Sequence, residues 1–189
     1  MKPLYWIAGV VIAVLLYLIG IYNRLVSLRQ SVDAAWSDIQ VQLKRRANLI
    51  PALIETVKGY QHYEADTLER IVRARDHALK AEGVKEQEKA EHELSRALRQ
   101  LFALSEAYPE LKANETFLQL QEQLSSIEEA IQNARRYYNA VVRDYNTRIE
   151  SFPDLLVARR FGFAPREFFE MEEDEARRAS EMPQIDLER

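Results

Sequence analysis

The fold is decided by residues 114–146, NETFLQLQEQLSSIEEAIQNARRYYNAVVRDYN. Apolar residues recur here every seven positions in two rows, which favours a long helix packed along one face. The first row is Phe117, Leu124, Ile131, Tyr138 and Tyr145, and the second is Leu120, Ile127, Ala134 and Val141. The side chain of Asn114 can accept a hydrogen bond from the first turn. We therefore predict a helix from Asn114 to about Glu150, stopped by Phe152 and Pro153.

A second heptad pattern lies upstream, in a stretch without glycine from Ile21 to Lys58. Its main row is Trp36, Leu43, Ile50 and Val57, and the adjacent row contains Val32, Ile39 and Leu53. Pro51 removes one backbone hydrogen bond and clashes with the preceding turn. Because the seven-residue register continues beyond Pro51, we predict a kink there rather than a reversal. Gly59 is expected to loosen or end the helix.

Two further helices are predicted between these long ones. Helical spacing relates Leu68, Ile71, Val72, Arg75 and Leu79, and also Leu94, Leu98, Leu101 and Tyr108. A turn is expected around Gly83 and a break before Pro109. After the long helix, Pro153 and Gly162 are placed to begin and close a short helix. The sequence thus predicts an all-α, antiparallel up-down bundle of long helices, preceded by a transmembrane helix. A dimeric coiled coil explains the same seam, but the turns favour folding back within one chain.

The transmembrane helix is predicted at residues 4–22, LYWIAGVVIAVLLYLIGIY, which carry no charge. As a helix this stretch can cross a hydrocarbon core of about 30 Å. It is longer than the apolar region of a signal peptide and lacks a small-residue cleavage pattern near its end. The chain has no cysteine for a lipid anchor. We therefore expect an uncleaved single-pass anchor in the lipid bilayer, after a short tail at residues 1–3.

The orientation of the anchor depends on few charges. Lys2 and the terminal amine precede it, whereas Arg24 and Arg29 follow it closely. Positive residues near a span favour the cytosolic side. We expect the N-terminus outside and the body in the cytosol.

The remaining chain divides into a predicted bundle, residues 23–163, and an acidic tail, residues 164–189, predicted to be extended or disordered. The net charge is −4, and five acidic residues lie between Glu170 and Glu175. Such a charge balance offers no footprint for nucleic acid. Arg135 and Arg136 lie beside Tyr137 and Tyr138, but Tyr138 belongs to the apolar seam, so core tyrosines with hydrogen-bonded hydroxyls are expected instead.

The sequence contains no recognisable catalytic or metal motif. The histidines are His62, His77 and His92, and none follows a glutamate by three positions, as di-iron bundles require. His92-Glu93 lacks the second histidine of a zinc-protease motif, since Arg96 stands at that position. There is no glycine-rich phosphate loop either. We expect no enzymatic activity, no cofactor and no metal.

Two surface features are candidate interaction sites. The triplet Lys44, Arg45 and Arg46 is either a solvated face with one arginine paired to a bundle carboxylate, or a patch for an acidic partner such as a neighbouring subunit's tail. Within the span, Gly9, Ala13 and Gly20 form a stripe of small residues, which allows close helix approach in lipid. The stripe favours a homo-oligomer.

Several motifs resemble the LemA family of bacterial membrane proteins. They are YNxLV at residues 22–26, AWSDIxVQLKRR at 35–46, LIPxLIETVKGY at 49–60, YPxLKANxxF at 108–117, ARRYYN at 134–139, YN at 145–146 and FP at 152–153. The resemblance covers residues 20–163. It implies one N-terminal span in the bacterial inner membrane, an antiparallel bundle of long helices, and an external N-terminus with a cytosolic bundle. It implies no chemistry, because the family has no settled molecular activity.

From these features we expect a membrane-anchored, self-associating scaffold or adaptor without enzymatic activity. The alternative is an accessory subunit of another membrane protein, such as a zinc metallopeptidase, which senses a signal or presents substrate. A stoichiometric enzyme partner, found by pull-down in mild detergent, distinguishes the second from the first.

Overall fold

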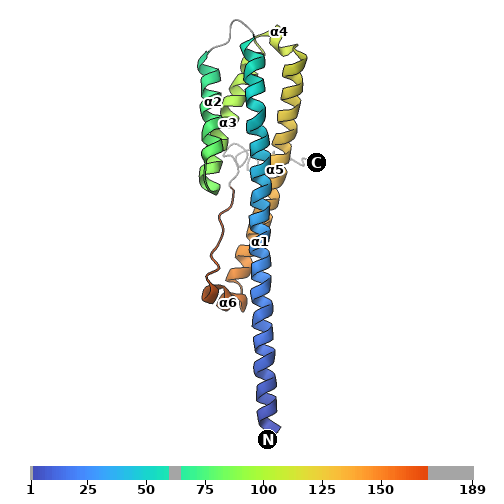
Figure 1. The fold of residues 1–189 in the computed structure, drawn as a ribbon, viewed down its shortest axis with the longest axis vertical. Coiled ribbons are helices and arrows are strands. Elements are labelled where there is room, and N and C mark those ends of the chain that lie inside the picture. Colours follow the sequence, from blue (N-terminus) through green and yellow to red (C-terminus); the bar gives the residue numbers. More distant parts are fainter. Residues whose placement is uncertain (1, 60–64, 170–189) are drawn as a thin grey trace, which may run out of the picture. The chain divides into compact units, whose positions relative to one another are not determined.

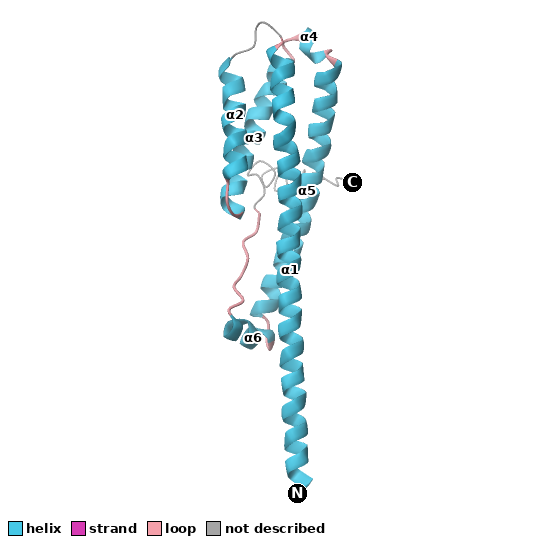
Figure 2. Cartoon of the chain, in the orientation of Figure 1, coloured by secondary structure: helices cyan, strands magenta, loops and turns pink. Residues whose placement is uncertain are grey.

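The computed structural model describes residues 2–59 and 65–169, which form six helices and no strand (Figures 1 and 2). The helices are α1 (Lys2–Lys58), α2 (Ala65–Lys80), α3 (Val84–Ser105), α4 (Pro109–Lys112), α5 (Glu115–Glu150) and α6 (Asp154–Phe161). The predicted all-α fold with a long N-terminal helix is confirmed. Residues 170–189, which hold most of the predicted acidic tail, lie outside the described residues.

The helix α1 joins the apolar stretch to the bundle without a break. It runs through Pro51, so the predicted absence of a reversal is confirmed, and it ends immediately before Gly59. Within the described residues it is the one helix long and apolar enough to cross a membrane. Its side chains from Tyr5 to Gly20 are exposed, and burial begins at Ile21 and Leu25. The same helix therefore passes from a solvent- or lipid-facing rod to a core element.

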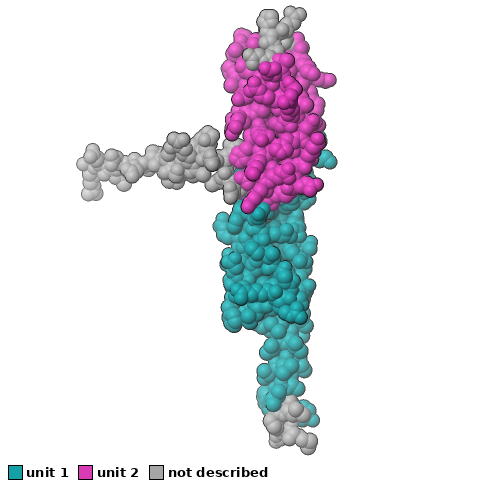
Figure 3. Space-filling view, turned by 90° about the vertical axis from the view of Figure 1, so that its left-hand side faces the viewer, with its two compact units in different colours: residues 1–49, 121–168 teal, residues 50–120, 169–189 magenta. Residues whose placement is uncertain are grey.

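The chain divides into two compact units, coloured in Figure 3. The first contains residues 1–49 and 121–168, and the second contains residues 50–120 and 169–189. In the first unit, α1 and α5 lie side by side, because the Trp36 and Tyr138 rings are 5.6 Å apart. Its core is formed by apolar side chains of both helices, including Ile21, Leu25, Val32, Ile39, Leu43, Leu124, Ile131, Val142 and Ile149.

The second unit is built around the α2–α3 hairpin. Gly83 forms the turn with φ 79°, a backbone conformation that glycine adopts without strain. The hairpin buries Leu68, Ile71, Leu94 and Leu101. On α2 the buried face continues through Ala74 and Ala78, whereas Val72 and Leu79 of the predicted row are exposed. The helix α3 ends at Ser105, so Tyr108 of the predicted third helix instead precedes α4.

The helix α5 has the predicted length and start. The Asn114 side chain accepts a hydrogen bond from the Phe117 amide at 2.9 Å, as expected of a cap. The row from Phe117 to Tyr145 is buried within a single chain. In the second row, the buried residues are Leu120 and Ile127 near the start of the helix and Val142 and Ile149 near its end. The later pair lies one position beyond the predicted heptad register. A straight helix drifts by about 20° per heptad, which accounts for this shift.

The short helix α6 also begins and ends as predicted. Pro153 precedes it, and Gly162 closes it in the left-handed conformation with φ 72°. The Phe163 amide donates to the Ala158 carbonyl oxygen at 3.0 Å, which satisfies an end carbonyl of the helix.

Candidate functional site

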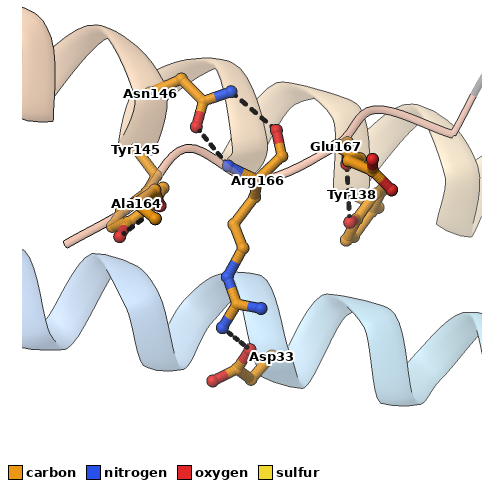
Figure 4. A network of polar contacts seen from close by, with 7 residues as sticks. All are labelled: Asp33, Tyr138, Tyr145, Asn146, Ala164, Arg166 and Glu167. Atoms are coloured by element: carbon orange, nitrogen blue, oxygen red, sulfur yellow. Dashed lines mark hydrogen bonds and ion pairs between the residues drawn. The ribbon is translucent and has the colours of Figure 1, made fainter. Parts of the chain in front are cut away.

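The polar site that ties the first unit together lies where an extended segment runs along α5. We call residues 163–168 the strap. The Tyr138 hydroxyl donates to the Glu167 carbonyl oxygen at 2.9 Å, and the Tyr145 hydroxyl donates to the Ala164 carbonyl oxygen at 3.0 Å (Figure 4). Both tyrosine rings belong to the buried heptad row. The seam thus supplies hydroxyl donors that hold the strap along the helix.

Asn146 binds the strap backbone at two points. Its side-chain amide donates to the Arg166 carbonyl oxygen at 2.9 Å, and its carbonyl oxygen accepts from the Arg166 amide at 2.8 Å. The Arg166 side chain then reaches α1, where its Nη2 lies 2.8 Å from an oxygen of Asp33 (Figure 4). The strap therefore bridges α5 and α1.

The described start of the predicted tail is ordered. Residues 164–168 are extended, and the hydrogen bonds above hold them along α5. Composition gives no sign of these hydrogen bonds, because the partner side chains on α5 lie 19, 20 and 29 residues earlier in the chain.

Burial raises the pKa of both strap-binding tyrosines above the ordinary value of 10.0. The Arg166 guanidinium acts in the opposite direction and lowers the pKa of each. The neutral hydroxyl is thus the form that the folded protein favours, and it is the form that can donate to a carbonyl oxygen.

An aromatic cluster joins α6 and the start of the strap to α1. The Tyr22 ring lies 4.9 Å from the Phe161 ring and 5.8 Å from the Phe163 ring. The Arg29 guanidinium lies 5.3 Å from the centroid of the Phe163 ring, a cation–π distance. At the α5–α6 corner, Arg148 forms an ion pair with the buried carboxylate of Asp154.

An apolar groove adjoins this cluster, with a volume of about 530 Å³. It is lined by Leu15, Leu18, Ile19 and Tyr22 of α1 and by Leu156, Val157, Arg160 and Phe161 of α6.

The structure separates the three residues of the predicted basic patch. Arg46 is 3% exposed, and its Nη1 lies 2.5 Å from a carboxylate oxygen of Glu128 on α5. Lys44 and Arg45 are exposed, and Arg45 donates to the Gln42 side chain at 3.2 Å. Arg46 thus takes part in packing α1 against α5, which leaves two cations on the surface.

The predicted stripe of small residues lies on the exposed part of α1. Gly9, Ala13 and Gly20 are all exposed, and apart from the neighbouring backbone of α1 itself no described atom lies within 4 Å of a Cβ placed on either glycine. No other part of the described chain packs closely on the two glycines.

The described histidines form ordinary side-chain pairs. His77 Nδ1 lies 2.9 Å from a Glu93 oxygen, which joins α2 to α3, and His92 Nε2 lies 3.9 Å from a Glu88 oxygen. His62 lies outside the described residues. No group of three or more His, Asp or Glu side chains in residues 2–59 and 65–169 is arranged to hold a metal ion.

Tyr137, beside the predicted core tyrosine, is exposed, whereas the Tyr138 hydroxyl is hydrogen-bonded as expected. Sequence reasoning did not assign Asp33, Asn146 and Arg166 to a site. The available signal was an asparagine directly after a seam tyrosine, followed downstream by a proline-containing segment without helical periodicity.

These features define a class, a helical bundle whose first helix begins with an apolar stretch long enough to cross a membrane. The LemA family model matches residues 35–186, and the chain belongs to the LemA family.

Curated relatives agree with this assignment. Protein LemA of Metamycoplasma hominis is 26% identical over 174 residues, covering 90% of this chain and 74% of that protein. Magnetosome proteins MamQ 1 and MamQ 2 of Paramagnetospirillum magneticum are each 25% identical over 186 residues, covering 85% of this chain and 68% of each relative. None of these names states an enzymatic activity. Together with the apolar part of α1, the relatives indicate a membrane-associated protein of the LemA type.

Proposed function

We propose that this chain is a membrane-anchored scaffold or adaptor, without enzymatic activity, that self-associates through its span. The observation that carries the proposal is the continuity of α1, in which an exposed apolar rod becomes a core helix of the charged body. An anchor built this way transmits the position of the bilayer directly to the bundle. The names of the relatives state no competing chemistry.

Self-association is supported by the stripe of Gly9, Ala13 and Gly20. In lipid, helices associate by close packing where small residues let the backbones approach. The open space beside both glycines leaves room for a second helix.

The experiment is the mass of the full chain in detergent, measured by light scattering. We expect the native chain to form an oligomer and the variant Gly9→Ile with Gly20→Ile to shift toward the monomer. The control is Ala8→Ile, which adds a branched side chain off the stripe. A monomeric native chain, or equal loss of association in the control, would contradict this interface. A stoichiometric enzyme retained in mild detergent would favour the accessory-subunit alternative.

The proposed location is the bacterial inner membrane, with the N-terminus outside and the bundle in the cytosol. Because the chain has no cysteine, one introduced at the exposed residue Val41 reports the side of the bundle. We expect an impermeant maleimide to label Val41→Cys only after the inner membrane is opened. Labelling in intact spheroplasts would show the opposite orientation, with the bundle outside.

A further inference from the structure

We propose that α6 is a second membrane contact: its exposed apolar face lies in the lipid interface of the leaflet where α1 leaves the bilayer. The proposal requires α1 to be inserted, but it does not require self-association. It commits to lipid as the occupant of the groove and of the surface around it.

The first argument is depth. The groove pairs α6 with Leu15, Leu18 and Ile19, which belong to the apolar stretch of α1. At 1.5 Å per residue, Leu15 lies about 10 Å before Tyr22, the last residue of that stretch. The 19 residues of the stretch just match a hydrocarbon core of about 30 Å. Since α6 packs beside these residues within one unit, insertion of α1 brings α6 to the membrane surface or below it.

The second argument is the outward surface of this corner. Phe152, Leu156 and Phe161 are 80%, 59% and 60% exposed. Three large apolar side chains so close together in a short segment are costly in water, whereas interfacial helices bury such a face about 5–10 Å into the boundary of headgroups and acyl chains.

The third argument is charge. The one acid of α6, Asp154, is buried and paired with Arg148, so it presents no carboxylate to the lipid. Arg159 and Arg160 are exposed, as is Arg24 on α1. Arginines can keep their guanidinium groups at the phosphate level while their stems lie along apolar surface. The charged groups of this surface therefore complement anionic headgroups.

The test uses variants of the full chain that each carry a single cysteine. Each variant is reconstituted at one protein molecule per nanodisc, in phosphatidylethanolamine and phosphatidylglycerol. Leu156→Cys probes α6, Val11→Cys probes insertion of the span, and Val41→Cys is an exposed control on α1, about 33 Å beyond Ile19 at 1.5 Å per residue. The thiolate is the reactive form, and a low-dielectric environment suppresses it. We expect Leu156→Cys to react with an aqueous maleimide roughly tenfold more slowly than Val41→Cys, close to Val11→Cys.

Lipid and protein cover are distinguished by a second readout. A fluorophore attached at Leu156→Cys should be quenched by lipids brominated on their acyl chains, and one at Val41→Cys should not. Reaction at Leu156→Cys as fast as at Val41→Cys overturns the proposal when Val11→Cys is protected. Protection without quenching also overturns it, because protein then covers α6. Exposure of Val11→Cys instead shows failed insertion, which contradicts the proposed anchor as well.

Discussion

Ile131 lies in the buried row of α5 and is 3% exposed, so it reports the contribution of the seam to stability. We expect Ile131→Ala to lower the free energy of unfolding by about 2–5 kcal/mol, from lost burial and the cavity left behind. Denaturant unfolding of the full chain in detergent measures it. The control is Leu118→Ala on the same helix, where the side chain is 47% exposed. Equal effects at the two positions would show that the seam is not the core.

Tyr138 and Tyr145 predict a pH dependence of stability. Their pKa values are raised in the folded protein by burial, whereas an unfolded tyrosine titrates near 10. Below about pH 10 both states are protonated and the stabilisation is complete. As pH rises further, the unfolded chain loses these protons first, so the contribution falls and is lost through the raised folded pKa.

The double variant Tyr138→Phe with Tyr145→Phe tests this dependence. We expect the free energy of unfolding of the native chain to fall more steeply above about pH 10 than that of the variant. Only the difference between the two curves is interpreted, because it isolates the two hydroxyl groups. Parallel curves would contradict a role for these hydroxyls.

Arg46 and Arg45 are adjacent in sequence but differ in environment. We expect Arg46→Ala to cost about 1–3 kcal/mol, because it removes a buried side chain and its ion pair with Glu128. Arg45→Ala, at an exposed position, should change stability by no more than about 0.5 kcal/mol. The measurement is the same denaturant titration. A stability loss at Arg45 as large as at Arg46 would contradict the assignment of Arg46 alone to packing.

At the scale of elements, the strap fits α5 because its two carbonyl acceptors are as far apart as the two tyrosines that bind them. Tyr138 and Tyr145 are seven residues apart, or about 10.5 Å along a helix. Their acceptors, at Glu167 and Ala164, are three residues apart, or about 10 Å along an extended chain. The earlier tyrosine binds the later strap residue, so the strap runs antiparallel to α5. A heptad row can therefore bind an extended segment in a fixed register.

Asn146 is the residue that we expect to fix this register, because it binds both the amide and the carbonyl of Arg166. Asn146→Ala should release the strap and speed hydrogen exchange of residues 163–168, with a stability loss of about 1–3 kcal/mol. Exchange followed by mass spectrometry measures it. Asn133→Ala, at an exposed position of the same helix, is the control. Unchanged exchange in Asn146→Ala would show that the two tyrosines suffice.

At the scale of the whole molecule, the acidic tail and the exposed cations Lys44 and Arg45 remain candidates for contact between subunits. If the tail of one copy binds this surface of another, removing residues 170–189 should lower the oligomer fraction, and the effect should shrink at high salt, where exposed charges are screened. Mass in detergent at two salt concentrations measures it. An unchanged oligomer fraction would exclude the tail as a subunit contact.

Much of the fold was predictable because it follows from local rules. The candidate span follows from length and absence of charge, the long helices from heptad spacing, and the start of α5, the α2–α3 turn and the end of α6 from Asn114, Gly83 and Gly162. The predicted core residues were wrong where helical spacing alone does not decide which face of a helix is buried. On α2, Val72 and Leu79 have helical spacing but small Ala74 and Ala78 are buried instead. Hydropathy favours the larger residues, whereas packing depends on which face a neighbour covers.

The sequence by itself determined the helices of the described residues and one apolar stretch long enough to cross a membrane, because apolar periodicity and uncharged length act locally along one helix. Only the tertiary structure decided which polar residues work together. Asp33, Asn146 and Arg166 lie on three segments, and Phe161 meets Tyr22 across most of the chain length. No local pattern encodes these contacts, since each depends on how α1 and α5 are packed and where the strap and α6 return to them.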